Sequence, residues 1–555
     1  MERKNIFSRH RLIIGLLFFP VIVGAQDLLN KGKVSGNFQL DVQTYIEDST
    51  IGAPAVPEKL LTNGFANINY TLGGFSAGIR YEMYLNPILG YDQNYKGNGI
   101  PYWYANYIKD DFEITVGNFY EQFGNGLIFR TYEERNLGYD NAMNGVRVKY
   151  SPFNGVYIKG IIGTQRYYWE KGPGIVRGID GEVFLNDIIK KMDDKKTNIS
   201  LGGSFVSKYQ KDDPSSDFHL PLNVGAWAGR FNISRGKVSL LAEYASKIND
   251  PSGVNNMIYK GGDALLMTGS YSQKGLGIVL SAKRIDNMSF KSSRNEISNA
   301  LDINFLPPLS KVHTYSLPAI YPYATQPNGE MGLQGQVVYN IKKKSKLGGK
   351  YGMNISSTYS VVYSIDKTML NDSTPISTEG TLGYDTKFFS IGDDKYFQDF
   401  NIEVTKKFNR KWKGIFTYMN LIYDIEVIEG HVGDATVYAN IAIADINYKI
   451  TPKKSLRLEL QSLFTKQDEG DWFAALLEYS IAPKWFITAM DMYNYGNNDP
   501  DRRFHYYNFS VAFIKKTNRI SLGYGKQREG ILCVGGVCRA VPASNGFALT
   551  ITSSF

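Results

Sequence analysis

The chain of 555 residues is long enough for one very large β-domain or for several ordinary domains. Hydrophobic residues make up 43% and the mean hydropathy is −0.27, which excludes a helical membrane protein. The net charge of +9 is mild and spread along the chain, with no basic stripe interleaved with aromatics, which argues against nucleic-acid binding. Aromatic residues reach 14%, as expected of a β-barrel in lipid, whose aromatic girdles and polar interior keep the mean hydropathy low.

Residues 1–25 have the pattern of a secretory signal peptide. A basic start from Arg3 to Arg11 precedes the apolar run Leu12–Val23, and Gly24-Ala25 supply small residues before a cleavage point. The apolar run is too short to span a bilayer as a helix, although an uncleaved anchor is the alternative. No Cys follows the cut, so lipoprotein processing is not indicated. We expect the mature chain, residues 26–555, in the oxidising cell envelope.

The first strand is expected at Val34–Gln43, where apolar and polar residues alternate. Because it begins almost directly after the signal peptide, no room remains for the plug domain of a TonB-dependent receptor. The next two strands are expected at Ala66–Leu72 and Phe75–Met83. Gly73-Gly74 between them supplies the positive φ angles that a two-residue hairpin requires.

The same alternation continues along the chain, and short turns alternate with long polar connections. All short turns lie at the same end of the barrel only if residues 175–186 form a strand and residues 188–196 form the turn after it. The pattern then predicts an all-β fold: a single transmembrane antiparallel up-and-down β-barrel of about 24 strands (range roughly 18–26), with short periplasmic turns and long outer loops. The expected lumen face carries both signs of charge, which argues against a strongly ion-selective pore. Its charged residues are Asp41, Arg80, Glu82, Glu113, Lys149, Glu243, Lys283, Glu403, Arg457, Glu459 and Asp491.

Residues 118–144 depart from this rhythm. Gly124 and Gly126 let the backbone bend sharply, and the Glu/Arg cluster after them could satisfy itself only in a polar interior. The segment resembles the inward-folding segment of porins and alginate-export-type barrels, although Asn144-Gly145 departs from their aspartate–glycine return. We expect it to narrow the lumen; an ordinary outer loop with surface ion pairs is the alternative. The expected constriction residues are Glu121, Arg130, Glu133, Glu134, Arg135, Asp140 and Arg147.

Residues 287–330 form a long outer connection that is rich in proline and aromatic residues. Pro307, Pro308, Pro318, Pro322 and Pro327 lower the entropy cost of ordering, so the loop is expected to be folded. It is either a lid or binding surface, or a structural cap over the barrel mouth.

Cys533 and Cys538 are the two cysteines of the chain, and they bracket Val534-Gly535-Gly536-Val537. If the two valines close a hairpin turn, the cysteines lie opposite each other and close enough to bridge. An oxidising compartment favours a disulfide, and a metal site needs more ligands than this hairpin offers. Residues 528–545 lead into the last strand, so strand parity places them outside.

The last strand is expected at Phe547–Phe555, where apolar and polar residues alternate up to a terminal aromatic. It resembles the terminal strand of bacterial outer-membrane β-barrels, which the barrel assembly machinery reads. Phe555 is then the expected assembly signal. The alternative, an edge strand of a soluble sandwich, is weakened by the strand parity of the whole chain.

The sequence offers little support for catalysis. The histidines show no metal-ligand spacing, and no nucleophile elbow or phosphate loop is found. We therefore expect no enzyme activity, no metal and no cofactor. The histidines considered are His219, His313, His431 and His505.

The whole mature chain resembles large outer-membrane barrels of Bacteroidota. Residues 117–150, residues 313–330 and the cysteine hairpin together are similar to an uncharacterised barrel family in that phylum. The resemblance implies the fold and an outer-membrane location, with the lipid bilayer and the assembly machinery as partners. The first hypothesis is a diffusion channel or export pore narrowed by residues 118–144. The second is a sealed barrel that serves as a structural or docking subunit of an envelope or secretion assembly, with an envelope protein as partner.

Overall fold

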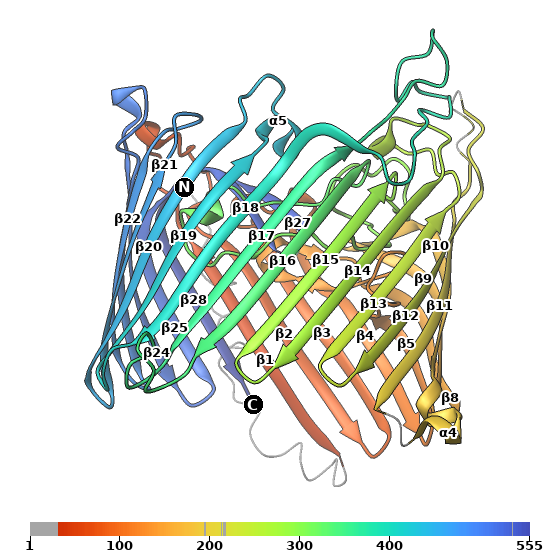
Figure 1. The fold of residues 1–555 in the computed structure, drawn as a ribbon, viewed down its shortest axis with the longest axis horizontal. Coiled ribbons are helices and arrows are strands. Elements are labelled where there is room, and N and C mark those ends of the chain that lie inside the picture. Colours follow the sequence, from red (N-terminus) through yellow and green to blue (C-terminus); the bar gives the residue numbers. More distant parts are fainter. Residues whose placement is uncertain (1–31, 194–195, 213, 215–217, 535–536) are drawn as a thin grey trace, which may run out of the picture.

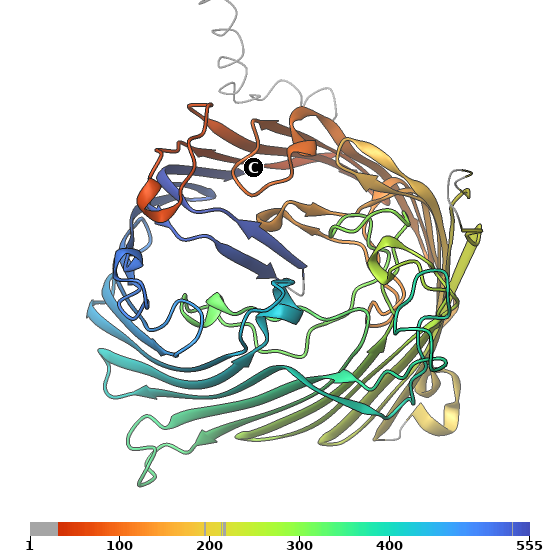
Figure 2. The same ribbon diagram turned by 90° about the horizontal axis from the view of Figure 1, so that it is seen from above.

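The computed structural model describes residues 32–193, 196–212, 214, 218–534 and 537–555, so the expected signal peptide lies outside the described residues. The chain folds into one closed antiparallel sheet of 24 strands, referred to below as the wall (Figures 1 and 2). Each wall strand pairs with the next along the chain, and β28 closes the ring on β1, with Leu40 opposite Ile551. The expected all-β, up-and-down barrel and its strand number are confirmed.

The wall strands have the following bounds: β1 (Lys33–Gln43), β2 (Leu61–Leu72), β3 (Phe75–Leu85), β4 (Gly97–Lys109), β5 (Phe112–Phe119), β8 (Met143–Phe153), β9 (Val156–Tyr167), β10 (Glu170–Phe184), β11 (Thr197–Tyr209), β12 (Asn223–Arg235), β13 (Val238–Lys247), β14 (Gly262–Gln273), β15 (Leu276–Asp286), β16 (Glu330–Ile341), β17 (Met353–Ile365), β18 (Ile391–Lys407), β19 (Trp412–Tyr423), β20 (Val437–Thr451), β21 (Lys454–Phe464), β22 (Trp472–Ile481), β23 (Trp485–Tyr493), β24 (His505–Lys515), β25 (Asn518–Gln527) and β28 (Ser544–Ser554).

The connections contain the remaining elements. None of the helices in the described part of the chain is long and apolar enough to cross a membrane. The elements are β6 (Glu133–Glu134), β7 (Tyr139–Asp140), β26 (Gly530–Val534), β27 (Val537–Val541), α3 (Leu185–Ile188), α4 (Lys190–Asp193), α5 (Ile425–Glu429), and the 3-10 helices η1 (Ser49–Ile51), η2 (Gln93–Tyr95), η3 (Arg135–Leu137), η4 (Gly253–Asn255), η5 (Pro318–Ile320) and η6 (Pro500–Arg502).

The two ends of the barrel have different connections (Figure 1). At the short-turn end, pairs such as Gly73-Gly74 and Asp110-Asp111 join the strands, and the turn after β10 contains the short helices α3 and α4. At the long-loop end most connections are long, and Tyr168-Trp169 between β9 and β10 is an exception. The alternation of turns and loops follows the predicted parity, because β10 forms where a descending strand was needed.

Each wall strand alternates between an outward and an inward face, as its period-2 pattern requires. The outward face is largely apolar, and the inward face carries charged residues together with apolar ones such as Val206 and Leu421. On β3, Phe75, Ile79 and Tyr81 are exposed on the outside of the barrel, whereas Arg80 and Glu82 are buried in the lumen. A soluble sandwich would bury its apolar face between two sheets. Here the apolar face is on the outside, and the expected lumen charges lie inside except for Asp491. The register places Asp491 on the outer face of β23 with Trp485, where it pairs with His505, so its expected place in the lumen was wrong.

Two segments expected on the outside lie inside the ring of strands instead (Figure 2). Residues 287–329, referred to below as the lumen belt, run along the inner surface of the wall. The β26–β27 hairpin, referred to below as the disulfide hairpin, reaches toward the centre of the barrel. The placement of 287–330 as an outer loop or mouth cap was therefore wrong, as was the outside placement of 528–545. Strand parity identifies the end at which a loop leaves the wall but not the direction in which it folds.

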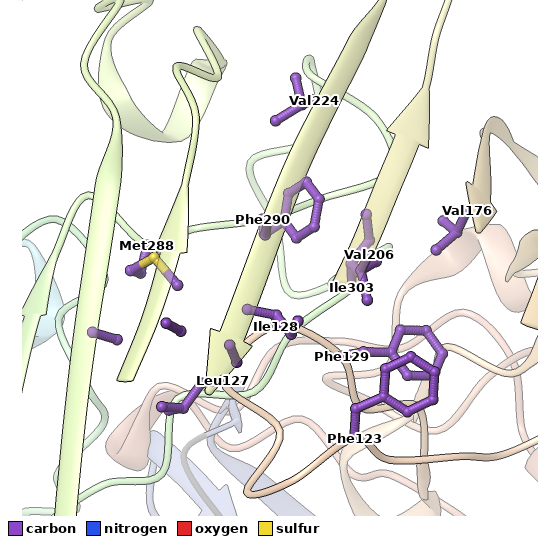
Figure 3. Packing of buried hydrophobic residues seen from close by; sticks show 14 of the residues in the cluster. Phe123, Leu127, Ile128, Phe129, Val176, Val206, Val224, Met288, Phe290 and Ile303 are labelled. Carbon is purple, nitrogen blue, oxygen red and sulfur yellow. The ribbon is translucent and has the colours of Figure 1, made fainter. Parts of the chain in front are cut away.

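Two apolar clusters hold the lumen belt in place. The first contains Phe123 and Phe129, whose ring centroids are 4.9 Å apart, together with Phe290 of the lumen belt and Val206 of β11 (Figure 3). In the second, belt residues pack on β17 to β22. Apolar side chains that enter a wide lumen lose contact with water only by packing on each other, so the segments fold together. The belt residues of the second cluster include Leu317, Ile320, Tyr321 and Tyr323.

Candidate functional site in the barrel lumen

Residues 120–142, referred to below as the insert, leave the wall between β5 and β8. Phe119 pairs directly with Met143, so the two ends of the insert stay adjacent while its middle enters the lumen. Backbone hydrogen bonds from Phe123 N to Phe129 O (3.1 Å) and from Thr131 N to Glu121 O (2.9 Å) close it on itself. The insert is thus a folded unit, and its removal would leave the wall strands able to pair.

Gly124 is where the insert comes closest to the wall. Its φ is +51°, and a Cβ at this position would lie 2.5 Å from Glu243 Oε2. The neighbouring Asn125 donates two hydrogen bonds to this oxygen, from its backbone N and from Nδ2, both 2.7 Å long. The Gly-x-Gly motif therefore serves both a positive φ and a close approach to a buried carboxylate.

Gly124→Ala should reduce the free energy of unfolding by about 2–6 kcal/mol. The positive φ costs a non-glycine residue about 1–3 kcal/mol, and loss of the hydrogen bonds to Glu243 adds about 1–3 kcal/mol. Urea-induced unfolding of the protein in lipid vesicles, followed by tryptophan fluorescence, measures the change. Gly160→Ala is the matched control, because an added Cβ there meets nothing within 4 Å. Equal losses for the two variants would contradict the role assigned to Gly124.

A buried ion-pair network joins the insert to β3 and β9. Arg166 donates to Glu82 (2.7 Å from Nη2 to Oε2) and to Asp140 (2.7 Å from Nη1 to Oδ2). Arg80 contacts Glu82 (2.6 Å) and Glu133 (2.9 Å) and also pairs with Asp140. Because each arginine bridges a wall carboxylate to an insert carboxylate, the network fixes the insert against the wall.

The surroundings of the insert carboxylates shift their pKa values in opposite directions. Burial alone would raise the pKa of Asp140, but Arg166 and Arg80 outweigh it and hold that pKa below its usual value. Burial raises the pKa of Glu133 despite the nearby Arg80. A fall in pH therefore protonates Glu133 before Asp140. The stabilisation from ionised Asp140 is present above its unfolded-state pKa and is lost as the pH falls through its lower folded-state pKa.

A second charged cluster lies where the insert faces β8, β9 and β10. Glu121 contacts Lys149 (2.8 Å), Lys159 (3.1 Å) and Arg147 (3.4 Å). Burial would raise the pKa of Glu121, but the lysines outweigh it and keep the carboxylate ionised. A cavity of about 410 Å³ adjoins this cluster, and its charged lining comes from the insert and the wall. The lining includes Glu121, Lys159, Asp180, Glu182 and Arg230.

The expected constriction residues separate into two charged clusters and two residues outside them. Glu133, Arg135 and Asp140 belong to the buried network or its border, and Glu121 and Arg147 belong to the second cluster. Arg130 instead stacks on two rings: its guanidinium carbon lies 4.0 Å from the ring centroid of Phe305 and 4.5 Å from that of Tyr132. Glu134 accepts a hydrogen bond from Asn136 N (3.2 Å).

Sequence reasoning missed several residues that hold the lumen segments. Arg166 lies at the centre of the network but was not among the expected lumen residues. Arg80, Glu82 and Glu243 were placed on the lumen face without a contact to the insert. The alternation of side chains along each strand indicated that these residues point into the lumen. It does not reveal which loop they contact.

Three buried wall lysines hold the first half of the lumen belt through its carbonyl groups. Lys208 donates to Lys291 O (2.9 Å), Lys283 donates to Pro307 O (2.7 Å), and Lys247 donates to Ser289 O. Lys283 also pairs with Glu330 (2.5 Å), and both side chains are fully buried. These lysines satisfy loop carbonyls that have no sheet partner.

The second half of the lumen belt crosses the opposite side of the barrel. His313 Nε2 lies 2.7 Å from Asp399 Oδ2 of β18, and Leu317 N donates to Gln461 Oε1 of β21 (3.0 Å). Tyr321 donates to Asp468 (2.8 Å) in the loop after β21. The belt therefore contacts strands from β11 to β21.

The disulfide hairpin closes the arrangement. The Cys533–Cys538 disulfide is present, and the two residues are directly paired across the hairpin. Asn299 Nδ2 of the belt donates to Cys538 O (2.5 Å), and Arg539 stacks on Tyr91 (4.2 Å). Residues of the insert, the belt and the hairpin line a shared cavity of about 300 Å³. Gly535-Gly536 at the hairpin tip lie outside the described residues.

Among the residues that the structure describes, no group of three or more His, Cys, Asp and Glu side chains could hold a metal ion.

The chain is similar in shape to several solved structures. The translocation pore of the P pilus usher PapC matches with a TM-score of 0.45 and 10% identity over 94% of this chain and 99% of its own. The siderophore receptor PirA from Pseudomonas aeruginosa matches with a TM-score of 0.42 and 9% identity over 94% and 80%. A mutant Rh. blastica porin matches with a TM-score of 0.26 and 9% identity over 94% and 100%.

Sequence comparison provides one match. No curated protein matches the chain. A family model described as "Family of unknown function (DUF6029)" matches residues 9–555.

Proposed function

The chain belongs to the DUF6029 family, whose function is unknown, and from this premise we propose that it is an outer-membrane channel with a lumen narrowed by the insert. The proposal assigns no catalysis to the chain. The resemblance to Bacteroidota barrels and the signal peptide stay predictions.

An outer-membrane location is supported by the outer face of the wall. Large apolar side chains such as Phe205, Trp227 and Leu280 are exposed there. The backbone groups of all 24 strands are paired around a closed ring, which is what a strand needs in hydrocarbon. By the usual asymmetry of such barrels, the short-turn end faces the periplasm. The pairing of β28 with β1 is consistent with Phe555 acting as the signal for the assembly machinery.

The charged cavity between insert and wall is the observation that carries the channel proposal. Glu121 of the insert pairs directly with Lys149 and Lys159 of the wall, and a cavity of about 410 Å³, which Glu121 and Lys159 help to line, adjoins these pairs. A route lined by acidic and basic side chains lets small hydrated ions and polar solutes interact with charged groups along its length. It does not bind either cations or anions strongly. We therefore expect a narrow, weakly selective pore.

The test is single-channel recording of the full protein in planar bilayers. Wild type should give small conductance steps and only a small reversal potential in a KCl gradient, because both acidic and basic side chains line the cavity. Lys149→Glu combined with Lys159→Glu should make the channel cation-selective, since it leaves Glu121 facing further carboxylates. Both lysines are partly exposed, so the new carboxylates reach water, and Glu121 keeps Arg147 as its cation partner.

Lys109→Glu is the matched control, because it changes an exposed charge next to a short turn outside the lumen. It should leave the reversal potential unchanged. No conductance from wild type, and none after removal of the insert, would overturn the channel proposal.

A sealed barrel that serves as a structural or docking subunit of an envelope or secretion assembly is the second candidate. The disulfide hairpin favours it, because the hairpin contacts both the insert and the lumen belt near the centre of the lumen. Such a subunit should copurify with a stable envelope partner after mild detergent extraction and cross-linking. Purification of the protein alone, with ion conductance, would count against this candidate.

A further inference from the structure

In the sector from β12 to β25, charge is strongly divided between the two ends of the barrel, whereas elsewhere the short-turn end includes the acidic turn Asp110-Asp111. From β12 to β25, every turn at the short-turn end contains Lys or Arg, and none contains Asp or Glu. The turn after β16 contains Lys342, Lys343, Lys344, Lys346 and Lys350, all exposed. The spread of charge along the sequence therefore becomes a basic surface in space, because antiparallel strands bring alternate connections to one end. The turns are 236–237, 274–275, 342–352, 408–411, 452–453, 482–484 and 516–517.

These basic turns have charge available for an external partner. Among the residues that the structure describes, none of their Lys or Arg side chains forms an ion pair with Asp or Glu, in contrast to lumen lysines such as Lys208 and Lys283. At the other end of the same sector, loops 424–436 and 465–471 have more acidic than basic residues. The positive potential is therefore concentrated at the short-turn end.

Aromatic side chains place these turns at the depth of lipid headgroups. Trp412 directly follows Lys411, and its ring centroid lies 4.5 Å from that of Tyr448. Trp485 directly follows Lys484, and its ring centroid lies 4.6 Å from that of Phe513. Both tryptophans are partly exposed on the outer face. Such rings sit at the membrane–water interface, so the adjacent cations reach phosphate groups. The green turn between β16 and β17 also projects outward from the wall in Figure 2, over the area that lipid would occupy.

We infer that the basic turns from β12 to β25 bind the phosphate groups of anionic phospholipids in the leaflet that the short-turn end faces. The inference rests on the membrane-embedded barrel proposed above, but not on conduction. An acidic protein surface is the competing partner. The aromatic girdle and the outward turn favour lipid, because a soluble partner below the barrel would need neither.

The test uses the full protein in phosphatidylcholine bilayers that contain either brominated phosphatidylglycerol or brominated phosphatidylcholine, with tryptophan quenching as the readout. Wild type should associate with the anionic lipid at least about threefold more strongly, since each basic residue near an anionic surface contributes up to about fivefold. High salt should reduce the preference. A variant with five substitutions, in which the lysines of the turn after β16 become glutamine, should lose most of the preference for anionic lipid. That variant is K342Q/K343Q/K344Q/K346Q/K350Q.

A matched control neutralises five exposed lysines at the long-loop end and should keep the wild-type preference. Equal association of wild type with the two lipids would overturn the inference. A second outcome would also overturn it: wild type shows no lipid preference but binds soluble polyglutamate, and the turn variant does not bind polyglutamate. That outcome would identify a protein-docking surface. Lipid preference without ion conductance would overturn the channel alone, and absence of quenching by either lipid would overturn the membrane-embedded barrel. The control variant is K59Q/K96Q/K171Q/K387Q/K466Q.

Discussion

Replacing residues 120–141 by Gly-Gly should raise the single-channel conductance severalfold. The insert occupies the lumen with four fully buried apolar residues, Phe123, Leu127, Ile128 and Phe129, and with the charged side chains that face β8 to β10. Its removal widens the route, and the wall should persist because Phe119 and Met143 remain paired neighbours. Recordings in planar bilayers measure the change, and heat-dependent migration on a denaturing gel checks that the barrel is folded.

The matched control shortens an exposed loop that lies away from the insert. Replacing residues 370–376, in the loop between β17 and β18 at the long-loop end, by Gly-Gly should leave the conductance unchanged, because most of this stretch is exposed. A folded insert-deletion variant with wild-type conductance would show that the insert does not form the constriction. The lumen belt or the disulfide hairpin would then be the next segment to remove.

Arg166→Met should lower the free energy of unfolding by about 3–5 kcal/mol, because it leaves buried carboxylates without their cation. Arg166 contacts both Glu82 and Asp140, and its side chain is only 3% exposed. Arg80 alone must then balance Glu82 and Asp140, while Glu133 keeps Arg135 as a second partner. The insert should be released before the wall unfolds, so proteolysis within 120–142 should appear at lower urea concentrations than the loss of the strands.

Two further variants separate the network from a general loss of an arginine. Arg502→Met changes an exposed loop arginine and should alter stability by no more than about 0.5 kcal/mol. Adding Glu82→Gln to Arg166→Met should restore part of the loss, because it removes one unpaired charge. Strictly additive effects of the two substitutions would contradict a shared network.

The barrel itself was predictable from local patterns. Strand faces follow from a period of two, and turns such as Gly73-Gly74 and Lys274-Gly275 mark the reversals. Counting strands succeeded because antiparallel neighbours in sequence are neighbours in space. The parity of the turns also identified β10 as a strand, although the residues after it form the short helices α3 and α4.

The candidate site was predictable only in part. Gly124, Gly126 and the Glu/Arg cluster marked the insert because such residues need a special backbone or a polar interior. The mouth-cap interpretation of 287–330 failed because the cations that hold the belt are wall lysines far away in sequence, such as Lys208, which is 83 residues from its partner Lys291. The pattern of one strand cannot show which loop will cover its inner face.

The sequence by itself thus determined which face of each strand is apolar, where the chain reverses and that the strands close into a barrel. These are local properties, since they depend on alternation within about ten residues and on turn chemistry. Only the tertiary structure decided that the insert, the lumen belt and the disulfide hairpin meet inside the barrel, and that scattered lysines form one basic surface. Those outcomes depend on which distant residues share a height and a side of the barrel, and this follows from closure of the whole ring.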